Sequence, residues 1–353
     1  MNTMNIKETT KEYYGKILKK SSDLKTNACC TSVKYPQYIL DIMKTIHEDV
    51  LSSYYGCGLV IPESLNKMNV IDLGCGTGRD VYILSKLVGE KGSVVGIDMT
   101  DEQLEIANKY IDYHREKNEF QKSNVVFKKG YIEELNQLDL KKDFYDIVVS
   151  NCVVNLSNNK QAVFEQVYQL LKKGGEFYFS DIYSDRRIPE KLRNNKVLWG
   201  ECLSGALYWN DFIQLAKKCG FTDPRLVSSN PTTIRNKELE KEVGNIKFYS
   251  ATYRLFKLPE LLESDCEDYG QAVMYTGTID NQSASWNLDN HHCFEKEKIM
   301  TVCGNTYNML FHSRFWGDFV YFNGGTYKHF GIFPGCGKNM PFENNSNSNS
   351  NCC

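Results

Sequence analysis

Four cysteines of this chain stand where a thiol could do chemistry: Cys29 in TNACC, Cys57 in YYGCG, Cys152 in VVSNCVV and Cys202 in WGECLSG. Thiolates are nucleophiles and ligands for soft ions. A cysteine taken singly is more often a packed core residue. Packing is therefore the role we expect for six others, Cys75, Cys219, Cys266, Cys293, Cys303 and Cys336. The 13 cysteines form no CxxC or CxxH motif, so their spacing does not favour a zinc site.

Cys152 has the most informative position of the four. It follows the apolar run YDIVVS at residues 145–150, which has the length and composition of a buried strand. Open α/β sheets bind their ligands at the carboxyl ends of the strands. A thiol at this point would therefore face a ligand held at that edge.

A glycine-rich segment, DLGCGTG at residues 72–78, could hold such a ligand. It joins a predicted strand at 68–73 to a helix that begins near Arg79. Glycines there let backbone N–H groups approach a ligand closely. Asp98, at the end of the next predicted strand, could accept both hydroxyls of a ribose. A dinucleotide loop of the GxGxxG type needs a small residue where Arg79 stands, and Asp72 suits a cationic ligand better than a pyrophosphate. The pattern D-x-G-x-G-x-G is similar to that of class I methyltransferases, which use S-adenosylmethionine.

The surrounding elements predict an α/β fold. Strands at 68–73, 93–98, 124–129, 145–150 and 175–181 alternate with helices from Arg79, at 101–117 and at 160–172. Gly174 and Gly175 are expected to end the last helix. Such alternation predicts a Rossmann-like core, mostly parallel, with helices on both faces. Two further helices, and strands near 225–227 and 247–254, form an α+β extension, and residues 270–335 lack helical periodicity and predict a small β-rich C-terminal domain.

Five segments follow from this pattern. The expected divisions are a helical segment at 1–65 carrying Cys29 and Cys57, a nucleotide-binding domain at 66–181, an extension at 182–256, a C-terminal domain of open role at 257–340, and a disordered Asn/Ser tail at 341–353.

Composition excludes several classes of protein. The 353 residues are 41% hydrophobic and 24% charged, which is typical of globular domains, and the formal net charge is -2. There is no basic stripe for nucleic acid and no apolar stretch for a membrane. No signal sequence is recognisable, so we expect a cytoplasmic protein, whose cysteines would not form a static disulfide framework.

The four cysteine-bearing segments resemble those of arsenite methyltransferases, in particular the animal-type enzymes. The resemblance rests on YYGKILKKSSDLKTNAC, YYGCGLVIPE, SNCVVNL and KVLWGECLSGALYW, and it covers about residues 11–256. It implies that S-adenosylmethionine is the cofactor and that arsenite and methylarsenite are the substrates. The cofactor contacts that the resemblance implies are Tyr55, Gly74, Gly76, Asp98, Met99, Gln103, Ile132, Glu133 and Asn151.

The same resemblance implies an arsenic site made by Cys57, Cys152 and Cys202, with Cys29 (or its neighbour Cys30) as a redox partner. Arsenic bound by three thiolates keeps a lone pair that can attack the methyl group, so no general base is needed. Methylation would yield methyl- and dimethylarsenicals in arsenic detoxification. Glutathione or thioredoxin is the expected reductant, and the protein is expected to be a monomer.

Two other hypotheses remain open at this point. The chain could methylate a small organic molecule, such as a phenol or a quinone precursor, with structural cysteines. It could also be a non-catalytic protein that sequesters soft metals. The spaced cysteines disfavour the first alternative, and the intact loop with Asp98 disfavours the second.

Overall fold

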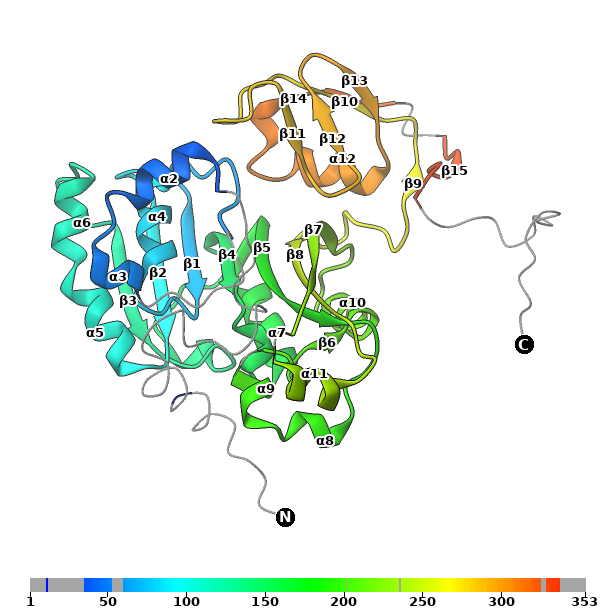
Figure 1. Ribbon diagram of the computed structural model, residues 1–353. Helices are drawn as coiled ribbons and strands as arrows, with labels where there is room; N and C mark the ends of the chain where they lie inside the picture. The colour runs from blue at the N-terminus through cyan, green and yellow to red at the C-terminus, as the bar shows by residue number, and fades with distance from the viewer. Residues whose placement is uncertain are drawn as a thin grey trace.

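A computed structural model describes residue 11 and residues 35–52, 60–200, 202–234, 236–324 and 328–336. The two largest parts are an α/β domain and, after Lys257, a smaller domain rich in β-structure (Figure 1). No helix in the described ranges is both long and apolar enough to cross a bilayer.

A single mixed sheet organises the α/β domain. Its strand order is β3-β2-β1-β4-β5-β8-β7, with the short β6 also paired to β5. The first five strands of that order are parallel, and β8 runs antiparallel to both β5 and β7. The bounds are β1 Asn69–Leu73, β2 Ser93–Asp98, β3 Val125–Lys129, β4 Tyr145–Asn151, β5 Leu171–Ser184, β6 Leu207–Tyr208, β7 Arg225–Thr232 and β8 Phe248–Phe256. The predicted Rossmann-like class is confirmed.

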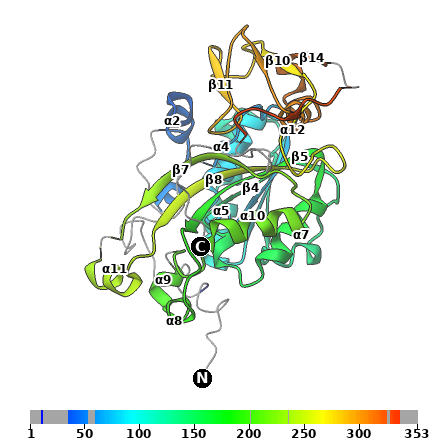
Figure 2. The same ribbon diagram turned by 90° about the vertical axis from the view of Figure 1, so that its right-hand side faces the viewer.

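Helices cover both faces of this sheet (Figures 1 and 2). Alternate residues of the buried strands supply the two cores: Val148 of β4 faces α7 and α10, whereas its neighbours Ile147 and Val149 face α2 and α4. The α-helices are α2 Gln37–Met43, α3 Glu48–Ser52, α4 Arg79–Val88, α5 Asp101–Lys109, α6 Ile111–Lys117, α7 Lys160–Leu170, α8 Glu190–Arg193, α9 Lys196–Gly200, α10 Trp209–Lys218 and α11 Lys237–Val243. Short 3₁₀ helices are η3 Leu135–Gln137 and η4 Val154–Leu156.

The C-terminal domain, residues 257–336 in its described part, contains small antiparallel sheets around one helix. Its strands are β9 Glu267–Asp268, β10 Ala272–Tyr275, β11 Ser285–Asn287, β12 Cys293–Glu295, β13 Ile299–Thr301, β14 Phe319–Phe322 and β15 Gly331–Ile332. The helix α12, Gly304–Phe311, precedes η5, Trp316–Asp318, and was not predicted. Its sequence GNTYNMLF opens with weak helix formers, and the Cys303 side chain caps it by accepting the Thr306 N–H.

Gly174 and Gly175 differ from the expectation. They lie inside β5 and do not end α7, whose last residue is Leu170. Gly174 has φ 82°, and a Cβ atom there would lie 2.1 Å from the His312 carbonyl oxygen. The glycine is therefore needed where the C-terminal domain approaches the sheet.

The C-terminal domain meets the sheet at the amino ends of the parallel strands. Arg314 forms an ion pair with Glu176, near the start of the buried part of β5, and also donates to the Glu63 carbonyl at 2.9 Å. Glu176 pairs in turn with Arg254 of β8 at 2.7 Å, and Arg254 with the Glu63 carboxylate at 2.9 Å. Two arginines and two glutamates thus balance each other in a buried network, and the carboxyl ends of the parallel strands lie at the opposite edge of the sheet (Figure 1).

Candidate active site

The loop after β1 is shaped by three glycines with left-handed backbones. Gly74, Gly76 and Gly78 have φ values of 73°, 53° and 86°. A Cβ atom on Gly74 would lie 2.3 Å from a methyl carbon of Val153, so this glycine permits the loops after β1 and β4 to pack together. Among the described residues, it would meet at Gly76 only the Gln103 side-chain oxygen, at 3.6 Å. Gly76 therefore leaves room for a ligand against its backbone.

Asp98 is held beside this loop at the end of β2. One carboxylate oxygen accepts the Gly76 N–H at 2.9 Å and the other accepts the Thr100 N–H at 2.8 Å. Burial nevertheless raises the pKa of Asp98. Each carboxylate oxygen has a second lone pair, so the fixed carboxylate can still accept hydrogen bonds from two ribose hydroxyls.

Acidic groups surround the same loop. Asp72, at the carboxyl end of β1, is 4% exposed, and its pKa is raised well above the usual range by burial and by the charges of Asp80 and Asp98. Asp80 itself pairs with Arg79 at 2.6 Å. A cationic ligand would relieve the repulsion among these carboxylates, which fits the sulfonium and amino groups of S-adenosylmethionine.

The other predicted cofactor residues that the structure describes lie at or just after the carboxyl ends of the strands. Met99 follows β2 and is half-buried, and Gln103 lies in α5. Ile132 and Glu133 follow β3, where Glu133 accepts the Ser157 hydroxyl at 3.3 Å. Asn151 ends β4, and its side-chain amide lies 3.4 Å from an Asp80 carboxylate oxygen. Tyr55 lies outside the described residues.

Two of the four predicted cysteines meet next to this loop. Cys152 follows β4, Cys202 follows α9, and the Cys202 thiol donates to the Cys152 carbonyl at 3.1 Å. Both side chains are buried, at 3% and 0% exposure. Their sulfur atoms and a carboxylate oxygen of Asp181 all lie within 4.8 Å of one another. We call Cys152, Asp181 and Cys202 the sheet-edge cluster.

Both cysteines of this cluster have backbones that favour glycine. The φ values are 58° at Cys152 and 62° at Cys202. A left-handed conformation costs a residue with a side chain about 1–2 kcal/mol, and such strain collects at functional sites. The Cys152 N–H donates to the Ser180 carbonyl of β5 at 2.9 Å, and the Cys202 N–H to the Trp199 carbonyl at 3.0 Å. These bonds hold the two cysteines in place against the strain.

Sequence reasoning missed Asp181 and Lys160, which adjoin the cluster. Asp181 accepts the N–H groups of Asn155 and Ile182 at 2.9 and 2.8 Å, and burial raises its pKa to about 7. The Lys160 ammonium donates to the carbonyls of Asn155 and Ser157, and burial lowers its pKa to about 8. The available signal was that Asp181 ends the predicted strand 175–181, at the same edge as Cys152.

The cysteines differ in their surroundings. Cys29 and Cys57 lie outside the described residues. Cys152 is disulfide-bonded, and no other described cysteine is its partner, since those are all free. Cys75 and Cys219 pack in the two cores as expected, whereas Cys293 is exposed and does not pack as expected. Contrary to the packing expectation, the last three, Cys266, Cys303 and Cys336, converge in the C-terminal domain.

The sheet order, the loop after β1 and the aspartate after β2 define a class I methyltransferase that uses S-adenosylmethionine. A profile described as a methyltransferase domain matches residues 64–220. A second profile, the arsenite methyltransferase C-terminal domain, matches residues 269–348.

Full-length relatives give the family. The chain is 50% identical to an arsenite methyltransferase of Aquipseudomonas alcaligenes, over 98% of this chain and 99% of that protein. It is 49% identical to the arsenite methyltransferase of Homo sapiens, over 89% of this chain and 83% of that protein. The crystal structure of CrArsM, an arsenic(III) S-adenosylmethionine methyltransferase of Chlamydomonas reinhardtii, superposes with a TM-score of 0.82 at 45% identity, over 85% of this chain and all of that one. The chain belongs to the arsenite methyltransferase family, and it is an enzyme that methylates arsenite with S-adenosylmethionine.

Proposed function

We propose that Cys57, Cys152 and Cys202 bind trivalent arsenic and present its lone pair to the methyl group. The observation that carries this proposal is the meeting of two buried cysteine side chains, both on strained backbones, beside the glycine loop. Arsenite binds by exchange: three As–O bonds break, three As–S bonds form and three water molecules leave. Arsenic is a soft centre, and thiolates are the ligands that such centres prefer.

Bound S-adenosylmethionine supplies a methyl group on a sulfonium sulfur. We infer that Asp98 fixes the ribose, that Gly76 admits the cofactor against the loop, and that Asp72 favours its positive charge. Glu133 and Met99 complete the predicted adenine contacts, with Gln103, Ile132 and Asn151 around them. The two loops that carry Gly74 and Cys152 touch through Val153. Alignment of arsenic with the methyl carbon is therefore set by direct packing, an entropic contribution of several kcal/mol.

The transfer oxidises arsenic, so a source of two electrons is required. The arsenic lone pair forms the As–C bond, the methyl–sulfonium bond breaks, and arsenic becomes pentavalent. We propose that two thiolates then give up two electrons, restore trivalent arsenic and leave a disulfide. Cys29 is the proposed partner in this relay. Cys152 supports this proposal, because it is itself disulfide-bonded.

An external dithiol or glutathione must then reduce the disulfide. We propose thioredoxin or glutathione as the reductant, the cytoplasm as the compartment and a monomer as the active form. The free thiols among the described cysteines support a reducing compartment. Turnover compared with each reductant alone would identify the physiological one.

The valence of arsenic provides the test of these roles. Arsenite has three exchangeable ligands, whereas monomethyl arsenic(III) has two. We expect Cys29→Ser and Cys57→Ser to lose methylation of arsenite and to keep methylation of monomethyl arsenic(III). Cys152→Ser and Cys202→Ser should lose both activities. The measurement is speciation of the arsenic products with each substrate.

Cys219→Ser is the matched control, because Cys219 packs between α10 and α7 away from the sheet-edge cluster. It should keep both activities. Loss of both activities in a folded, cofactor-binding Cys57→Ser variant would overturn the assignment of roles.

A further inference from the structure

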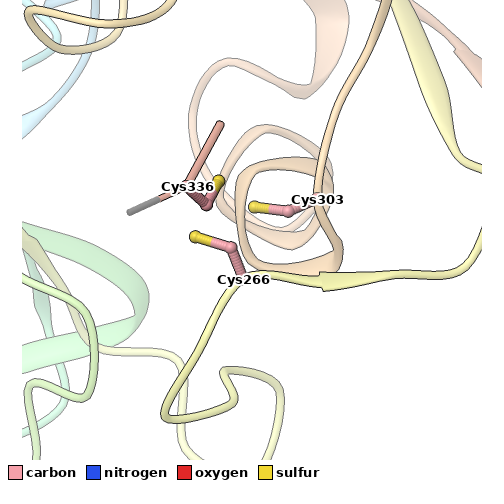
Figure 3. A group of neighbouring side chains, drawn as sticks. All are labelled: Cys266, Cys303 and Cys336. Atoms are coloured by element: carbon pink, nitrogen blue, oxygen red, sulfur yellow. The ribbon is translucent and has the colours of Figure 1, made fainter. Parts of the chain in front are cut away.

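Three thiols from distant parts of the sequence converge in the C-terminal domain. Cys266 precedes β9, Cys303 precedes α12 and Cys336 follows β15, and their sulfur atoms lie within 4.8 Å of one another. Figure 3 shows the three side chains as neighbours, with their sulfur atoms close together. Cys303 is fully buried, and the other two are half-buried. We call these residues the C-terminal cluster.

The surroundings of Cys303 favour its thiolate form. The Thr306 N–H and hydroxyl lie 3.4 and 3.3 Å from its sulfur atom, at the start of α12. A guanidinium nitrogen of Arg225, from β7, lies 3.9 Å from the same sulfur. The hydrogen bond with the Cys266 thiol lowers the pKa of Cys303 and raises that of Cys266. Hydrogen-bonding groups of Thr306 and the guanidinium of Arg225 therefore face the Cys303 sulfur atom.

The charges nearby limit what such a cluster can hold. Arg225 is already paired with Asp223 at 2.7 Å and with Asp289 at 3.0 Å. The two carboxylates more than offset this one positive charge, so a bound complex with net negative charge would be disfavoured. Three thiolates on a divalent ion carry one net negative charge, whereas three thiolates on a trivalent centre carry none. The described residues also offer no fourth histidine, cysteine or carboxylate ligand to the group, which a tetrahedral zinc site would need.

We propose that Cys266, Cys303 and Cys336 form a second binding site for trivalent arsenic, at which arsenic is held and not methylated. Arsenite enters with the loss of three hydroxyl ligands as water, three As–S bonds form, and arsenic stays trivalent, so no oxidant or reductant is needed. The C-terminal cluster lies near the amino ends of the parallel strands, whereas the glycine loop lies at their carboxyl ends. β4 alone has seven residues, so roughly 20 Å of sheet separates the two. An arsenic atom in the C-terminal cluster cannot reach the methyl group.

The test measures arsenic bound to the reduced, full-length chain with a phosphine as the reductant. Cys152→Ser/Cys202→Ser is the starting variant, because it lacks the proposed transfer site. Adding Cys336→Ser should lower arsenite affinity at the remaining high-affinity site by roughly tenfold or more, since a sulfur held in place by the fold is lost. Phenylarsine oxide, which needs two thiols, should still bind through Cys266 and Cys303. Cys293 is an exposed cysteine of the same domain, and adding Cys293→Ser should change the binding of neither arsenite nor phenylarsine oxide.

X-ray absorption at the arsenic edge should show three sulfur neighbours and no oxygen in the starting variant. Arsenite binding that is unchanged by Cys336→Ser would overturn the proposal. Displacement of arsenite by an equal concentration of zinc would also overturn it. So would a loss of phenylarsine oxide binding in the Cys336→Ser chain as large as the loss of arsenite binding. Because the transfer site is removed in these variants, failure here leaves the proposed methylation mechanism untouched.

Discussion

The sheet-edge cluster and the C-terminal cluster place thiols together by different means. Cys152 and Cys202 are fully enclosed and sit on strained left-handed backbones beside the cofactor loop. In the C-terminal cluster, Cys303 caps a helix and two half-buried partners complete the group. In the roles that we propose, strain and burial help the sheet-edge cluster to align a nucleophile, whereas the C-terminal cluster only has to bring three sulfur atoms together without excess charge. The difference suggests that proximity of thiols alone does not make a transfer site.

The largest expected effect is on catalysis. Cys202→Ser should reduce methylation of arsenite to background, because the serine hydroxyl is a hard ligand and the remaining thiol at this edge cannot present arsenic alone. The measurement is product formation at saturating S-adenosylmethionine, with Cys219→Ser as the control. If the C-terminal cluster could support transfer, the Cys202→Ser enzyme would retain turnover, and the distinction between the clusters would fail.

A second prediction concerns how the domain with the C-terminal cluster is attached. Arg314→Met should lower the free energy of unfolding by about 3 kcal/mol, because Glu176 and Glu63 would then share one buried arginine. Urea titration measures this. The matched control is Arg187→Met, which removes an exposed ion pair to Asp211 and should cost less than about 1 kcal/mol. Equal losses in the two variants would show that the buried network does not anchor the domain.

The third prediction concerns S-adenosylmethionine, which we expect to bind beside the sheet-edge cluster and not beside the C-terminal cluster. Asp98→Ala should weaken binding of S-adenosylmethionine by about 2 kcal/mol, the scale of charge-assisted hydrogen bonds. Calorimetry on the reduced enzyme gives the affinity. Asp101 is an exposed carboxylate paired with Lys129, so Asp101→Ala should leave the affinity for S-adenosylmethionine unchanged. Neither variant should change the affinity for arsenite. Unaltered cofactor affinity in Asp98→Ala would remove the ribose assignment.

The smallest effect is a pH dependence confined to the α/β domain. His114 of α6 stacks on Tyr82, its Nδ1 lies 2.7 Å from the Tyr110 carbonyl, and its Nε2 accepts the His47 N–H. Burial lowers its pKa to about 4. The unfolded chain therefore binds more protons between about pH 6.5 and pH 4, and stability falls as the pH falls through that range.

Between pH 7 and pH 5 this group should remove about 1 to 2 kcal/mol of stability. His114→Gln stays neutral, so the difference in unfolding free energy between the two pH values should shrink by that amount. Urea titrations of both proteins at pH 7 and pH 5 measure it. An identical pH dependence in the variant would show that this histidine is not held neutral.

Much of the α/β domain could be predicted from local pattern. The strands ending at Leu73, Asp98 and Asn151 are short, apolar and separated by helices, and their carboxyl ends identify the ligand edge. The helix predicted at 101–117 is divided at Tyr110, which has φ -106° and ψ 13°. Periodicity does not register a one-residue break of this kind, because the apolar face continues across it.

The parts that could not be predicted depend on contacts between distant residues. Asp181 and Lys160 join the site only because β5 lies beside β4 and because η4 turns back over them. Cys266, Cys303 and Cys336 share no motif, and their meeting follows from the path of the C-terminal domain. The roles of Cys57, Cys29 and Tyr55 remain predictions, since those residues lie outside the described part of the chain.

The position of β8 in the sheet has a consequence for how the protein is made. β8 lies between β5 and β7, although it is the last strand of the sheet in sequence. The edge of β5 that receives it therefore stays unpaired until Phe256 has left the ribosome, and β7 has no partner before then. Exposed strand edges attract other chains, so this interval of synthesis is when the nascent enzyme is most prone to misassembly.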